Sequence, residues 1–502
     1  MSLATFLVVA FGFAAGGWLT RERGNAGTVV GLGGLVAVTI AAIAIRPDEI
    51  LVIGEGGLAA SAYLRLFLVA GSLVGLGLAI SGLAAGTQRD LSTVTLATLG
   101  IAALTLSLTD PRAAVIAGTA GGLCGALLTV APGGDRAGAS AGVRDLRAVV
   151  IAGTMALAAM AWMGRDLSQL DAPPVVFGLA YLAVALAVAI RFGAIPFHVW
   201  VARLTDAVPD TGLPIVTVLA AAPFAVVGLG WANSSIEPLL VDLGTERGVV
   251  LAVAVSSIVL AAIAAFIQDD LEHVVGYSIV GDAGVALLAL VALDPEAWGP
   301  ARTWILALVV TRSAFAAWAA GLRLSFGTGR VVELRGWVVR SPVSAVAFGL
   351  VVIASLGFPG LAAFEARSTL VAAAIDGPFA TLVVVGALAP VAYYGRLLAV
   401  GLRRPDGPPE PAAWRPRVTA VNLTAPGEWW RTTWEANRAF SSALVATLLA
   451  ILAVSTAGGA FGGPEAAAAA AAGGQLPVAS SIPGSPDGLL SAESSFAPIP
   501  AE

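Results

Sequence analysis

The sequence contains no lysine, because all 27 of its basic residues are arginine. Among 502 residues it has one cysteine, Cys124, and two histidines, His198 and His273. A single cysteine excludes a disulfide framework and a cysteine-based metal site. The formal net charge of −5 is close to neutral for this length and gives no reason to expect nucleic-acid binding.

Charged residues are scarce throughout the chain. They make up 12% of it, against about 25% in soluble domains, whereas hydrophobic residues make up 58%. So much apolar surface cannot be hidden in a water-soluble core, and the sequence therefore predicts an integral membrane protein in contact with the lipid bilayer. No phosphate-binding loop, dinucleotide fingerprint, flavin motif or iron–sulfur motif occurs in it. We expect no metal and no cofactor in this chain.

Long apolar runs predict an all-α membrane fold. A helix needs roughly 20 mostly apolar residues to cross a bilayer, and continuous rather than alternating runs argue against a β-barrel. We count about fourteen transmembrane spans, near residues 3–19, 27–45, 63–84, 92–108, 112–131, 146–163, 174–203, 212–232, 247–267, 273–293, 302–322, 342–371, 377–401 and 439–460. The seventh and twelfth spans are too long for one straight helix and contain Pro196 and Pro359, which predicts a break in each.

The arginines predict the orientation. Connections on one side of the membrane hold seventeen of them, and those on the other side hold five (Arg46, Arg112, Arg165, Arg247 and Arg302). The positive-inside rule places the richer side in the cytoplasm. We therefore expect a multi-pass protein of a plasma or inner membrane, with both termini on the outer side.

The two predicted breaks lie beside arginines that fall inside spans. Arg191 precedes the break at Pro196, and Arg367 follows the break at Pro359. A charge at the bilayer centre costs roughly 2.5–3.5 kcal/mol on insertion scales, so its presence suggests function. Interrupted helices in corresponding places of two halves indicate the site of a transporter.

The breaks are five spans apart, which predicts two inverted five-helix repeats. The first repeat would cover residues 92–232 and the second residues 247–401, after three N-terminal helices in residues 1–91. We expect residues 402–438 to form a cytoplasmic linker with an interfacial stretch, and residues 439–460 to form the last span. Residues 461–502, rich in Ala, Gly, Pro and Ser, are predicted to be a disordered tail.

Four motifs support a family resemblance. They are PFHVW at 196–200 followed by PIVTVLAAAPF at 214–224, QDDLEHVVGYSIVGDAG at 268–284, ELRGWVVRSP at 333–342, and SLGFPGLAAFEAR at 355–367. In order and spacing, the sequence resembles the antiporter-like proton-translocating membrane subunits of respiratory complex I, most like subunit N, and the related subunits of Mrp-type Na+/H+ antiporters. The resemblance covers about residues 95 to 402.

The resemblance implies a proton relay, and this sequence departs from it at every position. The family's lysines in spans seven and eight fall on Arg191 and Phe224. Its lysine or glutamate in span twelve falls on Arg367, and its glutamate in span five falls near Thr119. A buried lysine can lose its proton, whereas arginine effectively cannot. The relay implied by the family is therefore either lost or rerouted.

Three further residues could reroute it. Asp282 lies inside the tenth span and Arg312 inside the eleventh, where they could either carry protons or form a structural ion pair. His198 follows the first break, where it could titrate near neutral pH or serve as a hydrogen-bonded cap. The predicted proton path is thus Arg191, His198, Asp282, Arg312 and Arg367. Asp206 and Asp210 could be proton entry groups or ordinary turn and cap residues, and we expect His273 to be a solvated end of the tenth span.

We therefore expect a non-catalytic, antiporter-like membrane subunit of a complex-I-type NADH:quinone oxidoreductase. It would take part in redox-coupled proton translocation beside homologous membrane subunits, with redox cofactors in its partners. Two alternatives stay open. The chain could be a non-conducting structural subunit of such a complex, or a component of an Mrp-like cation/proton antiporter.

Overall fold

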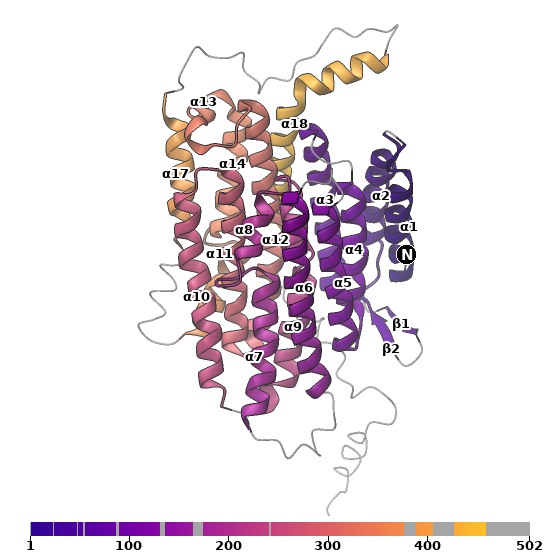
Figure 1. Ribbon diagram of the computed structural model, residues 1–502, viewed down its shortest axis with the longest axis vertical. Coiled ribbons are helices and arrows are strands. Elements are labelled where there is room, and N and C mark those ends of the chain that lie inside the picture. Colours follow the sequence, from indigo (N-terminus) through magenta and orange to yellow (C-terminus); the bar gives the residue numbers. More distant parts are fainter. Residues whose placement is uncertain are drawn as a thin grey trace, which may run out of the picture.

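A computed structural model describes residues 2–23, 25–47, 49–53, 56–86, 90–130, 136–163, 174–239, 242–375, 388–404 and 426–457. Its helices run side by side along the long axis of the molecule (Figure 1). Nine helices in these residues are long and apolar enough to cross a membrane. The predicted all-α membrane fold is confirmed, whereas the number of fourteen spans stays a prediction.

The N-terminal part contains three helices and one hairpin. The helices are α1 (Leu3–Thr20), α2 (Ala26–Ile43) and α3 (Ala62–Ala85), and the strands β1 (Ile50–Ile53) and β2 (Gly56–Ala59) connect α2 to α3. The two strands pair antiparallel, and Leu58 forms a further bridge with Leu108. The sequence did not predict this hairpin, because four-residue strands are too short to show an alternating pattern.

The next group of helices includes the first break. It comprises α4 (Leu91–Ser107), α5 (Pro111–Val130), α6 (Arg136–Met163), α7 (Pro174–Arg191), α8 (Val199–Thr205), the π-helical turn η2 (Ile215–Leu219), α9 (Ala222–Ser235) and the 3-10 turn η3 (Glu237–Leu239). Helix α6 begins ten residues before the predicted span at 146. Arg144 and Arg147 therefore lie on the exposed face of a helix and not in a connection.

The third group includes the second break. It comprises α10 (Gly244–Ile267), α11 (Leu271–Ala292), α12 (Pro295–Phe326), the 3-10 turn η4 (Val331–Glu333), α13 (Trp337–Arg340), α14 (Pro342–Leu356), α15 (Ala362–Ala374) and α17 (Pro390–Leu402). Helix α12 has 32 residues, and its most apolar window is fully buried, so it forms the core of the bundle. The predicted boundaries at 302–322 were too short for it.

The last described helix is α18 (Pro426–Ala457), which packs against α3, α12 and α14. Its first part runs sideways from one end of the bundle (Figure 1). One continuous helix crosses residue 439, and the division there into an interfacial stretch and a last span stays a prediction. Residues 405–425 of the predicted linker and the predicted tail from residue 461 lie outside the described residues. The division into inverted repeats stays a prediction.

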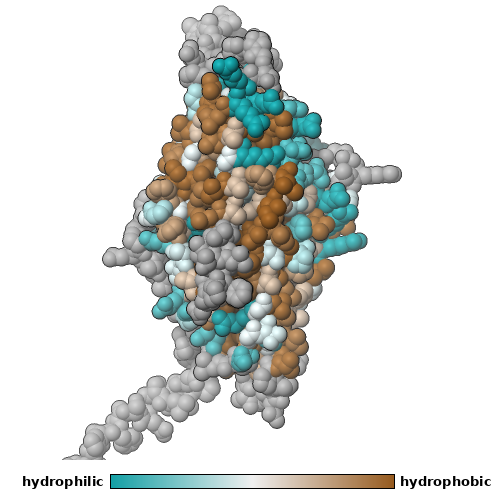
Figure 2. Space-filling view, turned by 90° about the vertical axis from the view of Figure 1, so that its left-hand side faces the viewer, coloured by the Kyte–Doolittle hydropathy of each residue, from teal (hydrophilic) through white to brown (hydrophobic). Residues whose placement is uncertain are grey.

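Hydrophobic residues cover much of one long face of the molecule (Figure 2). Exposed apolar side chains of α10 include Leu260, Ile263 and Phe266. Helices with apolar outer faces suit contact with lipid or with another membrane subunit. Buried arginines in the same bundle are therefore exceptional and mark the candidate site.

Candidate functional site

The first break separates α7 from α8 directly after Arg191. The chain turns at Gly193, whose φ of 65° is in the left-handed region that glycine tolerates. The Ile195 N–H, which has left the helix, donates to Ser257 Oγ of α10 over 2.9 Å. Trp200 Nε1 of α8 donates to the Ile190 carbonyl over 3.1 Å. These two bonds satisfy backbone groups that the break would otherwise leave open within the membrane.

The second break separates α14 from α15. Gly357 and Gly360 have φ values of 63° and 90° and flank Phe358 and Pro359. A methyl group at Gly357 would lie 2.9 Å from the Phe364 backbone, so the close return of the chain requires glycine there. Arg367 lies on α15 and is only 6% exposed. Both predicted breaks and both buried arginines are therefore present.

Asp282 and Arg312 form a direct ion pair in the interior. Asp282 projects from α11, and Arg312 of α12 donates through Nε to its Oδ2 over 2.6 Å. Arg312 Nη1 donates to the Tyr394 hydroxyl of α17 over 2.8 Å. Arg367 of α15 also acts electrostatically on Asp282. Three helices thus bring one carboxylate and two arginines together, and a fourth supplies Tyr394. We call Asp282, Arg312 and Arg367 the second-half centre.

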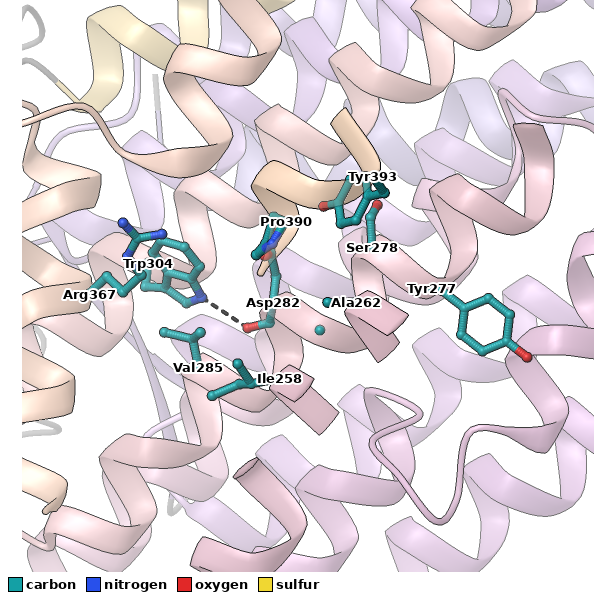
Figure 3. A pocket seen from close by; sticks show the side chains of 11 residues that line it. Ile258, Ala262, Tyr277, Ser278, Asp282, Val285, Trp304, Arg367, Pro390 and Tyr393 are labelled. Carbon is teal, nitrogen blue, oxygen red and sulfur yellow. Dashed lines mark hydrogen bonds between the residues drawn. The ribbon is translucent and has the colours of Figure 1, made fainter. Parts of the chain in front are cut away.

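A cavity of about 10 Å³ lies beside Asp282, which is the room that one water molecule needs. Its lining includes Ser278, Arg367 and Tyr393 (Figure 3). Trp304 Nε1 donates to the Asp282 carbonyl over 3.0 Å, shown as the dashed line in Figure 3. This bond fixes the turn of α11 that carries the carboxylate against α12. The centre therefore combines a buried acid with space for water.

His198 lies near this cavity but does not reach Asp282. Its ring contacts that of Tyr277 with 6.1 Å between centroids, and Tyr277 lines the same cavity while its ring points away from the other lining residues (Figure 3). His198 holds the N-cap position of α8, yet its side chain makes no capping bond. The histidine therefore contacts Tyr277 and does not act as the side-chain cap that its position suggested.

Arg191 lies apart from the second-half centre and faces a carboxylate that the sequence analysis missed. Asp145 of α6 is 0% exposed, and Arg191 acts on it electrostatically. We call Asp145 and Arg191 the first-half centre. The run Arg144-Asp145-Leu146-Arg147 resembled a connection, which hid the acid. The sequence spacing could have placed Asp145 on a buried helix face, because it lies four residues from both Ala141 and Val149. All three residues are buried.

The two relay positions without a charge hold no titratable group. Thr119 donates through Oγ1 to the Val115 carbonyl over 2.7 Å. Phe224 is 1% exposed and packs beside Gly118. In the described part of the chain, no group of three or more His, Cys, Asp or Glu side chains is placed to hold a metal ion. The chemistry that this arrangement offers is therefore proton exchange at carboxylates beside fixed positive charges.

A cluster of charged groups lies at one end of the bundle. His273 Nε2 is 3.3 Å from Asp206 Oδ1, and Arg323 pairs with both Glu272 and Asp210, the latter over 3.6 Å. Burial raises the pKa of Asp210 to about 6, and Arg323 opposes that rise. These residues connect the loop after α8 with the ends of α11 and α12. Asp206 and His273 therefore pair with each other, and Asp210 pairs with Arg323.

Comparison with known proteins identifies the family. Residues 114–391, more than half of the chain, match the family described as NADH:quinone oxidoreductase/Mrp antiporter, TM. The chain belongs to this family. The resemblance predicted from the motifs is confirmed, and the matched region contains both breaks and both centres.

Individual relatives agree with this assignment. The chain is 28% identical over 267 residues to NADH-quinone oxidoreductase subunit N of Halorhodospira halophila, covering 50% of each. It also resembles a chain of the Mrp complex from Dietzia sp. DQ12-45-1b, with a TM-score of 0.76 and 20% identity over 94% of this chain and 52% of that one. A chain of respiratory complex I from Thermus thermophilus gives a TM-score of 0.69 and 18% identity over 94% and 99%.

Identities this low to the solved structures show a shared fold. The chain spans about half the length of the curated relatives it matches.

Proposed function

We propose that this chain is an antiporter-like membrane subunit of a complex-I-type NADH:quinone oxidoreductase and takes part in redox-coupled proton translocation. The second-half centre carries the proposal. Asp282 is only 5% exposed and lies beside a water-sized cavity and two arginines. A structural scaffold in contact with lipid does not need a carboxylate at such a place. Intramembrane ionisable residues of this kind are costly and are typically part of ion pathways.

The arginines and the acid have different roles in this proposal. Arg312 and Arg367 keep their charge, because arginine effectively never loses its proton in proteins. Asp282 then accepts a proton from hydronium on one side of the centre, which leaves a neutral acid and water, and returns the proton to water on the other side of the centre. Arg312 holds the Asp282 carboxylate in place during the exchange, and Tyr394 holds Arg312.

The test is made on the complex purified with its partner subunits and reconstituted into liposomes. NADH oxidation and proton uptake are measured in parallel for Asp282→Asn, Asp282→Glu and the control Asp294→Asn. Asp294 is the N-cap of α12, and asparagine caps equally well there. We expect fewer protons per NADH for Asp282→Asn, partial recovery for glutamate, and no change in the control. An unchanged ratio in Asp282→Asn, with the subunit still in the complex, contradicts the proposal.

The likeness to the Mrp complex favours a second candidate, a component of a cation/proton antiporter. Such a chain would collapse a pH gradient in everted membrane vesicles when Na+ is added, without any NADH. Thr119 and Phe224 favour a third, a subunit retained for assembly only. In that case Asp282→Asn would leave proton uptake unchanged while loss of the whole chain disrupts the complex.

The partners and the orientation are part of the same proposal. We expect homologous membrane subunits as direct neighbours, and redox cofactors in other subunits of the complex. We also expect a plasma or inner membrane location, with both termini outside. Mass spectrometry of co-purifying subunits tests the first expectation. Protease access to a tag at each terminus, in intact cells and in everted vesicles, tests the second.

A further inference from the structure

Two buried opposite charges in the first-half centre lack the contacts that such groups require. Arg191 is 1% exposed and Asp145 is 0% exposed. No hydrogen bond reaches Nε, Nη1 or Nη2 of Arg191, or either carboxylate oxygen of Asp145, from the described residues. The two side chains nevertheless interact electrostatically. They are therefore neighbours that do not touch.

Helix α5 defines the space between them. A methyl group at Gly122 would lie 3.0 Å from Arg191 Nη2, and one at Gly125 would lie 3.5 Å from Asp145 Oδ2. Three residues along a helix correspond to about 4.5 Å. The guanidinium and the carboxylate therefore lie over neighbouring positions of the same helix face, at a spacing that a water molecule can bridge with two hydrogen bonds.

Leaving these atoms without partners would be costly. A buried charge without a partner costs several kcal/mol, and buried polar groups in native proteins are almost always hydrogen-bonded to protein or to ordered water. A water needs two to four polar partners, and five polar atoms are available here. Water between Arg191 and Asp145 satisfies them at little cost, since a bridged hydrogen bond is nearly as favourable as a direct one.

We infer that Asp145 and Arg191 form a second, water-bridged acid–base site between α5, α6 and α7, in which Asp145 exchanges a proton with the bound water. The step balances: hydronium gives a proton to the carboxylate, leaving carboxylic acid and water, and the reverse step releases it. Arg191 stays charged throughout. The site places a carboxylate on α6 in the half where the family's glutamate position holds Thr119.

The charges around the acid are simple. Arg191 of α7 is the one charged group that acts on Asp145 in the described part of the chain. Arg144 and Arg147, its neighbours on α6, point outward and are exposed. Helix α5 contributes glycine at the closest positions. Protonation of Asp145 therefore changes the site from neutral to a single positive charge.

This inference rests on the proposed function for its role in transport, but the site itself is tested without any transport. Infrared difference spectra of the purified complex, recorded on changing pH, report the C=O stretch of a protonated carboxyl. We expect a band that shifts in D2O and is lost in Asp145→Asn. The control Asp110→Asn, at an exposed carboxylate near the start of α5, should keep it.

Two further variants keep the inference testable if Asp145→Asn does not assemble. Asp145→Glu should retain a carboxyl band at a shifted position. Gly122→Ala should shift the band of Asp145 itself, because its methyl group would lie 2.6 Å from Val149 Cγ1, on the helix that carries Asp145, and 3.0 Å from Arg191 Nη2. In liposomes, Asp145→Asn should lower the protons taken up per NADH. A band present without any effect on uptake leaves the site standing and refutes its transport role.

Two results would overturn the inference. One is the absence of any band that depends on Asp145 over the pH range in which the complex stays folded. The other is a density map that resolves water and shows the Asp145 carboxylate bonded directly to Arg191. Either result would refute the Asp145 site even if Asp282→Asn lowered proton uptake as proposed. The inference about Asp145 and the proposed function can therefore be refuted separately.

Discussion

Replacing Ser257 by alanine should loosen the break between α7 and α8. Ser257 of α10 is 0% exposed, and its Oγ accepts the Ile195 N–H over 2.9 Å. The same hydroxyl donates to the Val253 carbonyl over 2.7 Å. Alanine removes the acceptor while leaving helix α10 intact, because the Val253 carbonyl remains within the helix.

The expected magnitude follows from the amide that is left without a partner. An unsatisfied buried N–H costs about 1–3 kcal/mol. Because about 1.4 kcal/mol corresponds to a tenfold change in an equilibrium constant, local opening of the break should increase roughly 5- to 150-fold. The cost acts on the folded break, because the bond from Ile195 to Ser257 joins the break to α10, whereas the Phe192, Gly193, Ala194 and Phe197 N–H groups donate to carbonyls of the same segment or of α7.

Hydrogen exchange measured by mass spectrometry tests this on the purified protein. Amides in residues 192–198 should exchange faster in Ser257→Ala by the factor above, whereas peptides from α12 should be unaffected. Ser256→Ala is the matched control, one residue away on the same helix and without a bond to the break. Equal protection of residues 192–198 in the two variants would show that Ser257 does not hold the break.

Two further predictions concern stability. Gly284→Ala should destabilise the α10–α11 pair by about 1–3 kcal/mol through overpacking, since its methyl group would lie 2.7 Å from the Ala254 carbonyl oxygen. In the control Gly281→Ala, the nearest atom to the new methyl group would be Ala261 Cβ at 3.8 Å. The control should therefore unfold at nearly the same temperature as the unchanged protein. For Asp210, a pKa raised from 3.8 to about 6 means that the folded state holds the proton more tightly. Stability should therefore fall by about 3 kcal/mol as pH rises from about 4 to 6, and Asp210→Asn should flatten that decline in the unfolding temperature. An equal pH dependence in both proteins would exclude this carboxyl as its source.

The sequence was sufficient to locate the breaks, because glycine and proline impose backbone geometry locally. Gly193 and Gly357 have positive φ values close to the two prolines that predicted the interruptions. The buried arginines were equally visible, since a charge within an apolar run needs no alignment to be noticed. Fold class and family followed from the same features, together with the order of the motifs.

The partners of those arginines were less accessible from sequence. Tyr394 is 82 residues from Arg312, and Trp304 is 22 residues from Asp282. Such contacts depend on how helices pack, and apolar periodicity does not determine the rotation of one helix against another in a chain that is hydrophobic on all faces. Asp145 was missed for a different reason, because the exposed arginines beside it made the start of α6 look like a connection.

The two centres differ in a way that bears on how a chain without lysine could conduct protons. The first-half centre pairs one arginine with one carboxylate, and the second-half centre places two arginines around one carboxylate. With fixed guanidinium charges, the deprotonated centres carry 0 and +1 formal charge, and each gains one on protonation. In the proposed function, replacing lysine by arginine therefore moves proton exchange from a base to an acid. Protonating either carboxylate removes a negative charge that stabilises the neighbouring arginine, and both arginines lie beside a helix break.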